Sequence, residues 1–208
     1  NTLPGTAAEI LDNRIREFLC PDKITAEQWG YVMEVAHSLG IKSTATIMFG
    51  HIDDIESWSN HFELIRNIQK RTSGFTEIVP LPFVHMGSPI FIQGKSMPGP
   101  TWDEVTLIHS LARIFFFNSI ENIQASWVKL GHDGVSKLLN AGVNDLGGTL
   151  INENISRASG ADHGQHTTDL QFIELIEKNN KVPFLRNTLY TEKKNLSEDI
   201  LSKDVIKL

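Results

Sequence analysis

The chain has 208 residues, of which 40% are hydrophobic and 21% charged, and its formal net charge is −6. This length and composition predict one globular domain and exclude a disordered polypeptide. The acidic balance argues against a nucleic-acid partner, and no uninterrupted apolar run is long enough to predict a membrane span.

Cysteine content and the first residues carry two further expectations. Cys20 is the single cysteine, so an intrachain disulfide or a multi-cysteine metal site cannot form within this sequence. A reducing compartment follows: the cytoplasm, or a reducing organelle if the source is eukaryotic. The start at Asn1 shows neither an initiator methionine nor a signal-peptide pattern, which is typical of a piece of a longer protein.

Helix starts are marked by three T-x-x-E/Q motifs, at residues 6–9, 25–28 and 101–104. In such a capping box the side chain of the first residue accepts a hydrogen bond from the fourth residue's backbone N–H, and the side chain of the fourth residue accepts one from the first residue's backbone N–H. Together with apolar periodicity, these motifs predict helices over residues 6–19, 25–39, 54–71, 101–117, 132–141 and 168–179.

Four short strand-like segments alternate with these helices, at residues 43–50, 75–80, 123–128 and 143–146. Alternating strands and helices predict an α/β fold with a mostly parallel sheet, and four such units make half of a TIM-type (β/α)8 barrel. An open doubly wound sheet is the alternative, although the chain lacks a G-x-G-x-x-G fingerprint. We assign residues 1–190 to this domain and residues 191–208 to a charged, mobile tail or a short peripheral helix.

Histidines follow the predicted strands. A lone loop histidine is more often a surface residue than a ligand or base, but repetition at corresponding positions favours a shared pocket at the face where barrel active sites lie. His51, His85, His132 and His163 each lie in a loop just after one of the four predicted strands, whereas His37, His61 and His109 fall inside predicted helices.

Two loops are more specific. Residues 80–89, PLPFVHMGSP, contain three prolines that stiffen the backbone around Phe83 and His85. Residues 142–164 combine Gly147-Gly148 with a dense group of polar side chains, which suits either a surface loop or a pocket wall. The position directly after a predicted strand favours the pocket wall.

Several strings carry a family resemblance: LPGTAAEIL (3–11), STATIMFGH (43–51), FTEIVPLPFVHMGSPI (75–90), NIQASWVKLG (122–131) and NDLGGTLINENISRASGADHG (144–164). They resemble the later part of radical S-adenosylmethionine (SAM) enzymes of deazaflavin synthesis. The similarity is to the 5-amino-6-(D-ribitylamino)uracil–L-tyrosine 4-hydroxyphenyl transferase subunit, or the corresponding half of FO synthase, and runs to about residue 190.

A related branch shares part of this pattern. The menaquinone-pathway enzymes aminofutalosine synthase and dehypoxanthine futalosine cyclase resemble the chain in the PG-x-x-AEI motif and the barrel. Thr6-Ala7 and the PLPFVHM loop favour the deazaflavin branch, while Ile151 and Asn154 depart from its pattern.

The resemblance implies a radical mechanism in the intact protein. Family members hold a [4Fe-4S] cluster on C-x-x-x-C-x-x-C, a motif that this chain lacks, so the chain resembles only the C-terminal part of the barrel and should be inactive alone. The intact enzyme would generate a 5′-deoxyadenosyl radical from SAM and transfer the 4-hydroxybenzyl group of L-tyrosine to the ribityl-uracil. A cyclising radical SAM subunit or domain would be its functional partner.

Roles for individual residues follow from the resemblance as expectations. Thr46 and His51 would face SAM or tyrosine, and His51 and His85 are the catalytic candidates, with His85 as acid or base. The substrate-binding candidates are Glu9, Asp145, Asn152, Glu153, Arg157 and His163, with no metal ligand in this chain. Glu9 also has a structural explanation as the fourth residue of a capping box. A metal-dependent barrel hydrolase and a non-catalytic binding domain remain alternatives.

Overall fold

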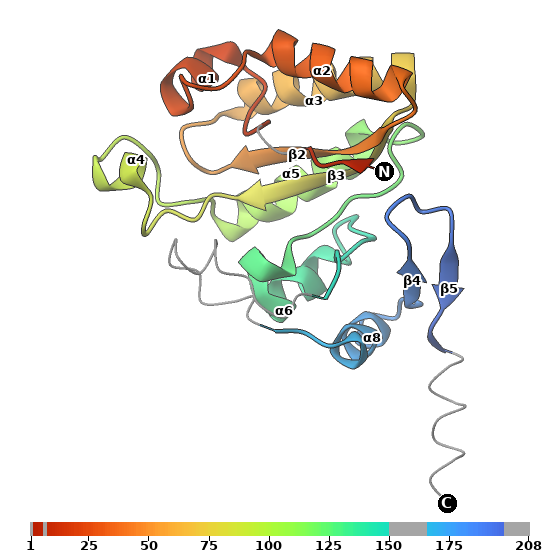
Figure 1. Ribbon diagram of the computed structural model, residues 1–208. Helices are drawn as coiled ribbons and strands as arrows, with labels where there is room; N and C mark the ends of the chain where they lie inside the picture. Colours follow the sequence, from red (N-terminus) through yellow and green to blue (C-terminus); the bar gives the residue numbers. More distant parts are fainter. Residues whose placement is uncertain (1, 6–7, 150–165, 198–208) are drawn as a thin grey trace, which may run out of the picture.

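Helices and strands alternate along the chain in the computed structural model, which describes residues 2–5, 8–149 and 166–197 (Figure 1). The strands are β1 (Thr2–Leu3), β2 (Lys42–Phe49), β3 (Phe75–Pro82), β4 (Phe184–Arg186) and β5 (Lys193–Asn195). The helices are α1 (Asn13–Leu19), α2 (Ala26–Ser38), α3 (Ile55–Thr72), α4 (Pro89–Ile92), α5 (Trp102–Phe115), α6 (Trp127–Leu138) and α8 (Asp169–Lys178). None of these described helices combines the length and apolar character needed to span a bilayer.

The sheet is parallel and is built in chain order. β1 pairs with β2, and β2 pairs with β3. Two parallel bridges, Ile78 with Ile123 and Gln124 with Asp145, continue the order across two further segments. Helices connect the successive parallel segments (Figure 1). The predicted α/β fold with parallel strands and crossover helices is therefore confirmed.

The strands bury one face more deeply than the other. Along β2, Ala45, Ile47 and Phe49 are fully buried, whereas Thr44 and Thr46, which alternate with them, are half-buried. Successive side chains of a strand point to opposite faces, so the buried set marks the side covered by helices. Thr46 therefore lies on the other face, which corresponds to the interior of a barrel.

Local sequence signals place most helices correctly. The capping boxes beginning at Thr25 and Thr101 are present in full, and a further box begins at Thr168, at the start of α8. Asp54 caps α3 in the same reciprocal way with Ser57. These caps satisfy backbone N–H groups that a helix leaves free at its first turn, which explains why the predicted starts hold.

The predicted helix over residues 6–19 is wrong at its beginning. α1 starts only after Asp12, and Glu9 has a φ of 39°, so it is not the fourth residue of a capping box. The segment before α1 instead runs beside β2, where the Met48 N–H donates to the Glu9 carbonyl at 2.7 Å. The buried guanidinium of Arg16 holds this segment through its carbonyl groups.

The predicted strand over residues 123–128 is also corrected. Only the bridges at Ile123 and Gln124 are strand-like, and α6 begins at Trp127 with a break at Gly131, where φ is 66°. The Trp127 ring packs edge-on against Phe172 of α8, a contact between distant segments that alternation along the chain does not reveal.

The C-terminal hairpin was not predicted. β4 and β5 pair antiparallel, with Phe184 opposite Asn195 and Arg186 opposite Lys193. Strand β5 lies inside the segment that composition assigned to a mobile tail. Each strand has three residues, of which the first two are exposed and the third is half-buried, so neither carries the apolar alternation that identifies a strand from sequence.

Two buried helix histidines predict a loss of stability in acid. Burial lowers the pKa of His61 to about 3 and that of His109 to about 4. The unfolded chain protonates these residues near pH 6.5 and the folded chain does not, so the free energy of unfolding falls as the pH drops from about 6.5 to about 4. Each histidine contributes a slope of up to about 1.4 kcal/mol per pH unit.

Urea unfolding across this pH range measures the effect. His61→Gln keeps an acceptor for the Leu11 N–H, which donates to His61 Nδ1 at 2.9 Å, but removes the titrating group. Its slope should be smaller than that of the unsubstituted chain by about 1.4 kcal/mol per pH unit. Equal slopes for His61→Gln and the unsubstituted chain would show that His61 does not cause this pH dependence.

Candidate functional site

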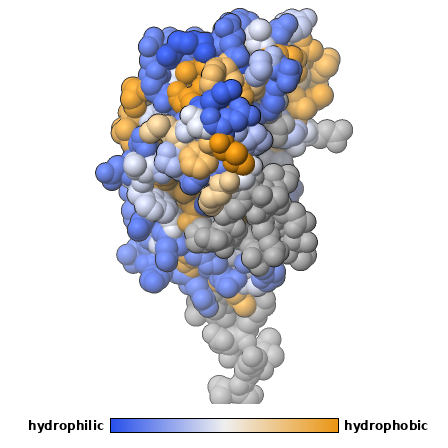
Figure 2. All heavy atoms as spheres, turned by 90° about the vertical axis from the view of Figure 1, so that its left-hand side faces the viewer, coloured by the Kyte–Doolittle hydropathy of each residue, from blue (hydrophilic) through white to orange (hydrophobic). Residues whose placement is uncertain are grey.

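Two loops meet where β2 and β3 end, at the edge that faces the viewer in Figure 2. The Phe83 N–H donates to the Phe49 carbonyl at 2.8 Å, and the Met97 N–H donates to the His51 carbonyl at 2.6 Å. The rings of His51 and Phe83 lie edge to face, with centroids 6.0 Å apart. The structure thus brings together two of the predicted loops, those that carry His51 and His85.

The turn after β2 is tightly fixed. Gly50 has a φ of 86°, and a Cβ atom there would lie 2.3 Å from Pro100. The Asp53 carboxylate accepts the N–H groups of Gly50 and His51, at 2.8 and 2.7 Å. Glycine is required here by both the conformation and the space, so the sharp turn is built into the sequence.

His51 is fully buried and braces this turn. Its Nε2 lies 3.0 Å from the Met48 carbonyl oxygen, and its Nδ1 accepts the Ile52 N–H at 2.7 Å. Burial lowers the pKa of His51 although the neighbouring Asp53 opposes the shift. Both ring nitrogens are engaged by the backbone in this structure, so its contact with SAM or with a substrate stays a prediction.

His85 sits in the more open of the two loops. It is half-buried, and its ring packs edge-on against Phe91 of α4 with centroids 4.4 Å apart. Met86, Ile92 and Met97 expose apolar side chains in the same loop. Figure 2 shows separate apolar patches among polar ones on this face. The imidazole is therefore held by packing beside an apolar surface at the carboxyl edge of the sheet.

Thr46 and Glu9, two further predicted site residues, are engaged within the chain. The Thr46 hydroxyl donates to the Gly5 carbonyl at 2.5 Å, on the interior face of the sheet. The Glu9 side chain forms an ion pair with Lys23. Their proposed ligand contacts are untested, and Glu9 would have to share its carboxylate with Lys23.

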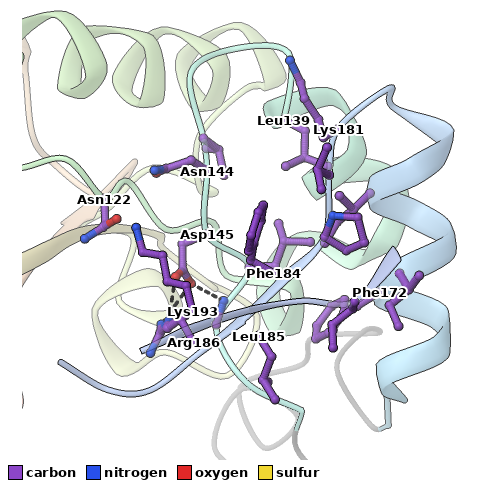
Figure 3. A pocket seen from close by; sticks show the side chains of 18 of the residues that line it. Asn122, Leu139, Asn144, Asp145, Phe172, Lys181, Phe184, Leu185, Arg186 and Lys193 are labelled. Carbon is purple, nitrogen blue, oxygen red and sulfur yellow. Dashed lines mark hydrogen bonds and ion pairs between the residues drawn. The ribbon is translucent and has the colours of Figure 1, made fainter. Parts of the chain in front are cut away.

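Asp145 occupies a different environment from the histidines. Its carboxylate is buried and accepts from Arg186 Nε at 2.8 Å (Figure 3). It also accepts from the Tyr190 hydroxyl at 2.8 Å. The second buried carboxylate, Glu77 on β3, lies 2.5 Å from the same hydroxyl and 3.5 Å from Arg186 Nη2. Gln124 completes the cluster with contacts to both acids.

The surroundings shift the pKa values of the two acids of this cluster in opposite directions. Burial and the charge of Asp145 raise the pKa of Glu77. Burial also acts to raise the pKa of Asp145, but the hydrogen bond and charge of Arg186 outweigh it, so the pKa lies below its usual range. The single Tyr190 hydroxyl hydrogen cannot be donated to both acids, so a proton on Glu77 would complete the hydrogen bonding.

This cluster is approached from the amino ends of the strands. Leu189 and Tyr190 line a small cavity together with Lys42 and Phe75, the first residues of β2 and β3. Catalytic residues of barrel enzymes lie at the opposite, carboxyl ends. The structure therefore assigns Asp145 to a contact with its own C-terminal hairpin, apart from the loops of His51 and His85.

Sequence reasoning did not identify Arg186 and Tyr190 as partners of these acids. The available signal was a carboxylate, Glu77, inside a largely apolar strand. A buried acid of this kind needs a cation or donor, but the sequence does not say which.

The remaining predicted residues divide into two groups. His132 lies within α6, not in a loop, where Nε2 contacts the Thr167 hydroxyl and the ring packs near Trp127. The substrate candidates Asn152, Glu153, Arg157 and His163 lie outside the described residues. Within the described ranges, no group of three or more acidic, histidine or cysteine side chains is arranged to hold a metal ion.

A cavity of about 1040 Å³ adjoins the acid cluster, between α8, the segment around Asp145 and the hairpin (Figure 3). Phe172, Phe184 and Leu185 form apolar walls, whereas Asn144 and Arg186 contribute polar groups. Its size suits a small organic ligand.

Comparisons with known proteins converge on one family. A model described as the CofH/MqnC C-terminal region matches residues 72–200. Over 190 residues, 91% of this chain, the sequence is 48% identical to the 5-amino-6-(D-ribitylamino)uracil–L-tyrosine 4-hydroxyphenyl transferase of Methanocaldococcus jannaschii, covering 53% of that protein.

Two further relatives show the same extent of similarity. The transferase of Methanopyrus kandleri is 47% identical over 190 residues, or 52% of its length. The FO synthase of Mycobacterium leprae is 44% identical over 190 residues, or 22% of its length. The chain thus spans about half the length of the transferases that it matches.

Proposed function

Because this chain belongs to the CofH/MqnC C-terminal region family, we propose that it is part of a radical SAM transferase. The reaction would join the 4-hydroxybenzyl group of L-tyrosine to 5-amino-6-(D-ribitylamino)uracil in deazaflavin biosynthesis. The observation that carries this proposal is the identity of 44–48% over 91% of the chain to proteins named as this transferase or as FO synthase.

The menaquinone-pathway alternative receives less support. The family description names both the CofH and MqnC branches, so the family match alone does not choose between them. The relatives compared above carry the transferase and FO synthase names, and their identity extends over the same 190 residues. These names favour the deazaflavin branch.

An iron–sulfur cluster does not fit the residues of this chain. Three thiolates are needed, and Cys20, which is half-buried in the loop after α1, is the single cysteine. We therefore propose that the cluster ligands lie in another part of the parent protein.

We propose that these 208 residues serve the substrate side of the reaction. SAM, when bound in the intact enzyme, would supply the radical chemistry, while the protein positions substrates and excludes water. Thr46 on the interior face and His85 at the carboxyl edge are the described residues best placed for this role, because each is only half-buried and so keeps part of its side chain accessible. Arg157 remains our candidate for a substrate carboxylate.

Anaerobic purification of the full-length parent protein tests this proposal. Iron and acid-labile sulfide should accompany the protein, and incubation with SAM, a reductant, ring-labelled L-tyrosine and the ribityl-uracil should give a labelled adduct by mass spectrometry. Adding the cyclising radical SAM partner should convert this adduct into the fluorescent deazaflavin FO. Stoichiometric zinc without iron would instead support the hydrolase alternative, and turnover of a futalosine-type substrate would support the menaquinone branch.

A further inference from the structure

The Asp145 carboxylate connects the C-terminal hairpin to a backbone turn. Oδ2 accepts from Arg186 Nε and from the Tyr190 hydroxyl, while Oδ1 accepts the Gly147 N–H at 2.7 Å. Arg186 Nη2 also reaches Oδ1, at 3.1 Å. A carboxylate held by a two-pronged guanidinium has a fixed plane as well as a fixed position.

The backbone of the Gly147 turn is restricted by its neighbours once the Asp145 carboxylate is fixed. Gly147 has a φ of 74°, and a Cβ atom there would lie 3.3 Å from Gln124 Nε2. The next carbonyl, of Gly148, accepts from Trp127 Nε1 at 3.1 Å. The turn is thus tied on one side to α6 and on the other, through Asp145, to the hairpin.

The hairpin residues are themselves locked together. The Arg186 guanidinium lies 4.4 Å from the centre of the Tyr190 ring, so the two side chains stack. The Tyr190 hydroxyl also reaches Glu77 on β3, which fixes the hairpin to the sheet at a second point. A movement of the hairpin would therefore rotate or release the Asp145 carboxylate.

We propose that Arg186 and Tyr190 are positioning residues that act through Asp145 to set the backbone course at Gly147, where the chain leaves the last parallel segment. The consequence for catalysis rests on the proposed function, because Gly147 directly follows the carboxyl end of this parallel segment, and barrel enzymes bind their substrates at the carboxyl ends of their strands. The hairpin then serves substrate binding from the amino ends of the strands without touching the substrate.

Tyr190→Phe in the full-length parent protein tests this role, with Glu192→Gln as the matched control from the exposed turn of the same hairpin. Loss of the hydroxyl should speed hydrogen exchange of the Gly147 amide by about tenfold, the scale of one buried hydrogen bond. The KM for 5-amino-6-(D-ribitylamino)uracil should rise about fivefold while kcat changes less than about twofold, because a positioning residue affects binding more than chemistry. The control should match the unsubstituted enzyme in both measurements.

The outcomes separate this proposal from the proposed function. Gly147 exchange equal to that of the control would overturn the positioning role, and so would a lowered kcat with an unchanged KM. If the unsubstituted enzyme makes no adduct, the proposed function is wrong. The positioning role is then judged only by hydrogen exchange of the Gly147 amide. If Tyr190→Phe unfolds, Arg186→Lys, which keeps the charge but loses the paired contacts, is judged by the same two criteria.

Discussion

Replacing Arg186 by alanine is expected to lower the free energy of unfolding by about 3–5 kcal/mol. The substitution leaves Asp145 and Glu77 buried within the sheet without their cation. Desolvation of an unpaired carboxylate costs more than the ion pair contributes, so the loss should far exceed that of a surface pair. Urea unfolding of the chain with and without Arg186→Ala measures this difference in the free energy of unfolding.

The exposed ion pair of Arg14 and Asp54 provides the control. Its charged atoms are 3.0 Å apart, close to the separation in the Arg186 pair, but both side chains are about half exposed. Arg14→Ala should therefore change stability far less, since water replaces the partner of Asp54. The buried Asp12 carboxylate, 3.7 Å from the Arg14 guanidinium, keeps its hydrogen bonds from the residue-14 N–H and from Asn60 Nδ2. Similar losses for the two variants would show that the buried cluster is hydrated and does not behave as a desolvated pair.

The pH dependence of the Arg186 effect has a definite sign. Arg186 holds the pKa of Asp145 below its usual range, so this contribution is present above the unfolded pKa of about 3.9 and is lost as the pH falls through the folded pKa. The difference between the two proteins should therefore shrink in acid.

Helix positions were predictable because their signals are local. Thr25 and Thr101 cap helices with residues three positions away, and no distant contact is needed to set those starts. The start of α1 depends instead on a pairing between Glu9 and Met48 and on the guanidinium of Arg16. Long-range contacts of this kind override a local capping motif, and no periodicity reveals them.

The candidate site was predictable in position but not in side-chain detail. The order of strands and loops correctly placed His51 and His85 at one edge of the sheet, because parallel strands end together. Whether a side chain points outward depends on tertiary contacts, and His51 turns back to the Met48 carbonyl. Asp145 shows the same limit more strongly, since its partners Arg186 and Tyr190 come from 41 and 45 residues further along the chain.

Substituting His85 by alanine in the full-length parent protein is expected to lower turnover by about 10²- to 10⁴-fold, the usual contribution of a positioned acid or base. Unlike His51, it is only half-buried, and its ring is oriented by Phe91 in a loop stiffened by prolines. Such packing keeps an imidazole in one orientation without occupying its nitrogens, as proton transfer requires. The measurement is the rate of adduct formation at saturating substrate.

Met86→Ala separates this chemical role from a structural one. Met86 is the neighbouring residue in the same loop and is 47% exposed, so its removal changes the loop surface but no acid or base. We expect turnover within about threefold of the unsubstituted enzyme for Met86→Ala, since a surface truncation away from the chemistry has a small effect. His85→Gln should resemble His85→Ala, because glutamine preserves size and hydrogen bonding but does not titrate. If His85→Gln retains full turnover, hydrogen bonding by the side chain suffices, and the proton-transfer role of His85 is wrong.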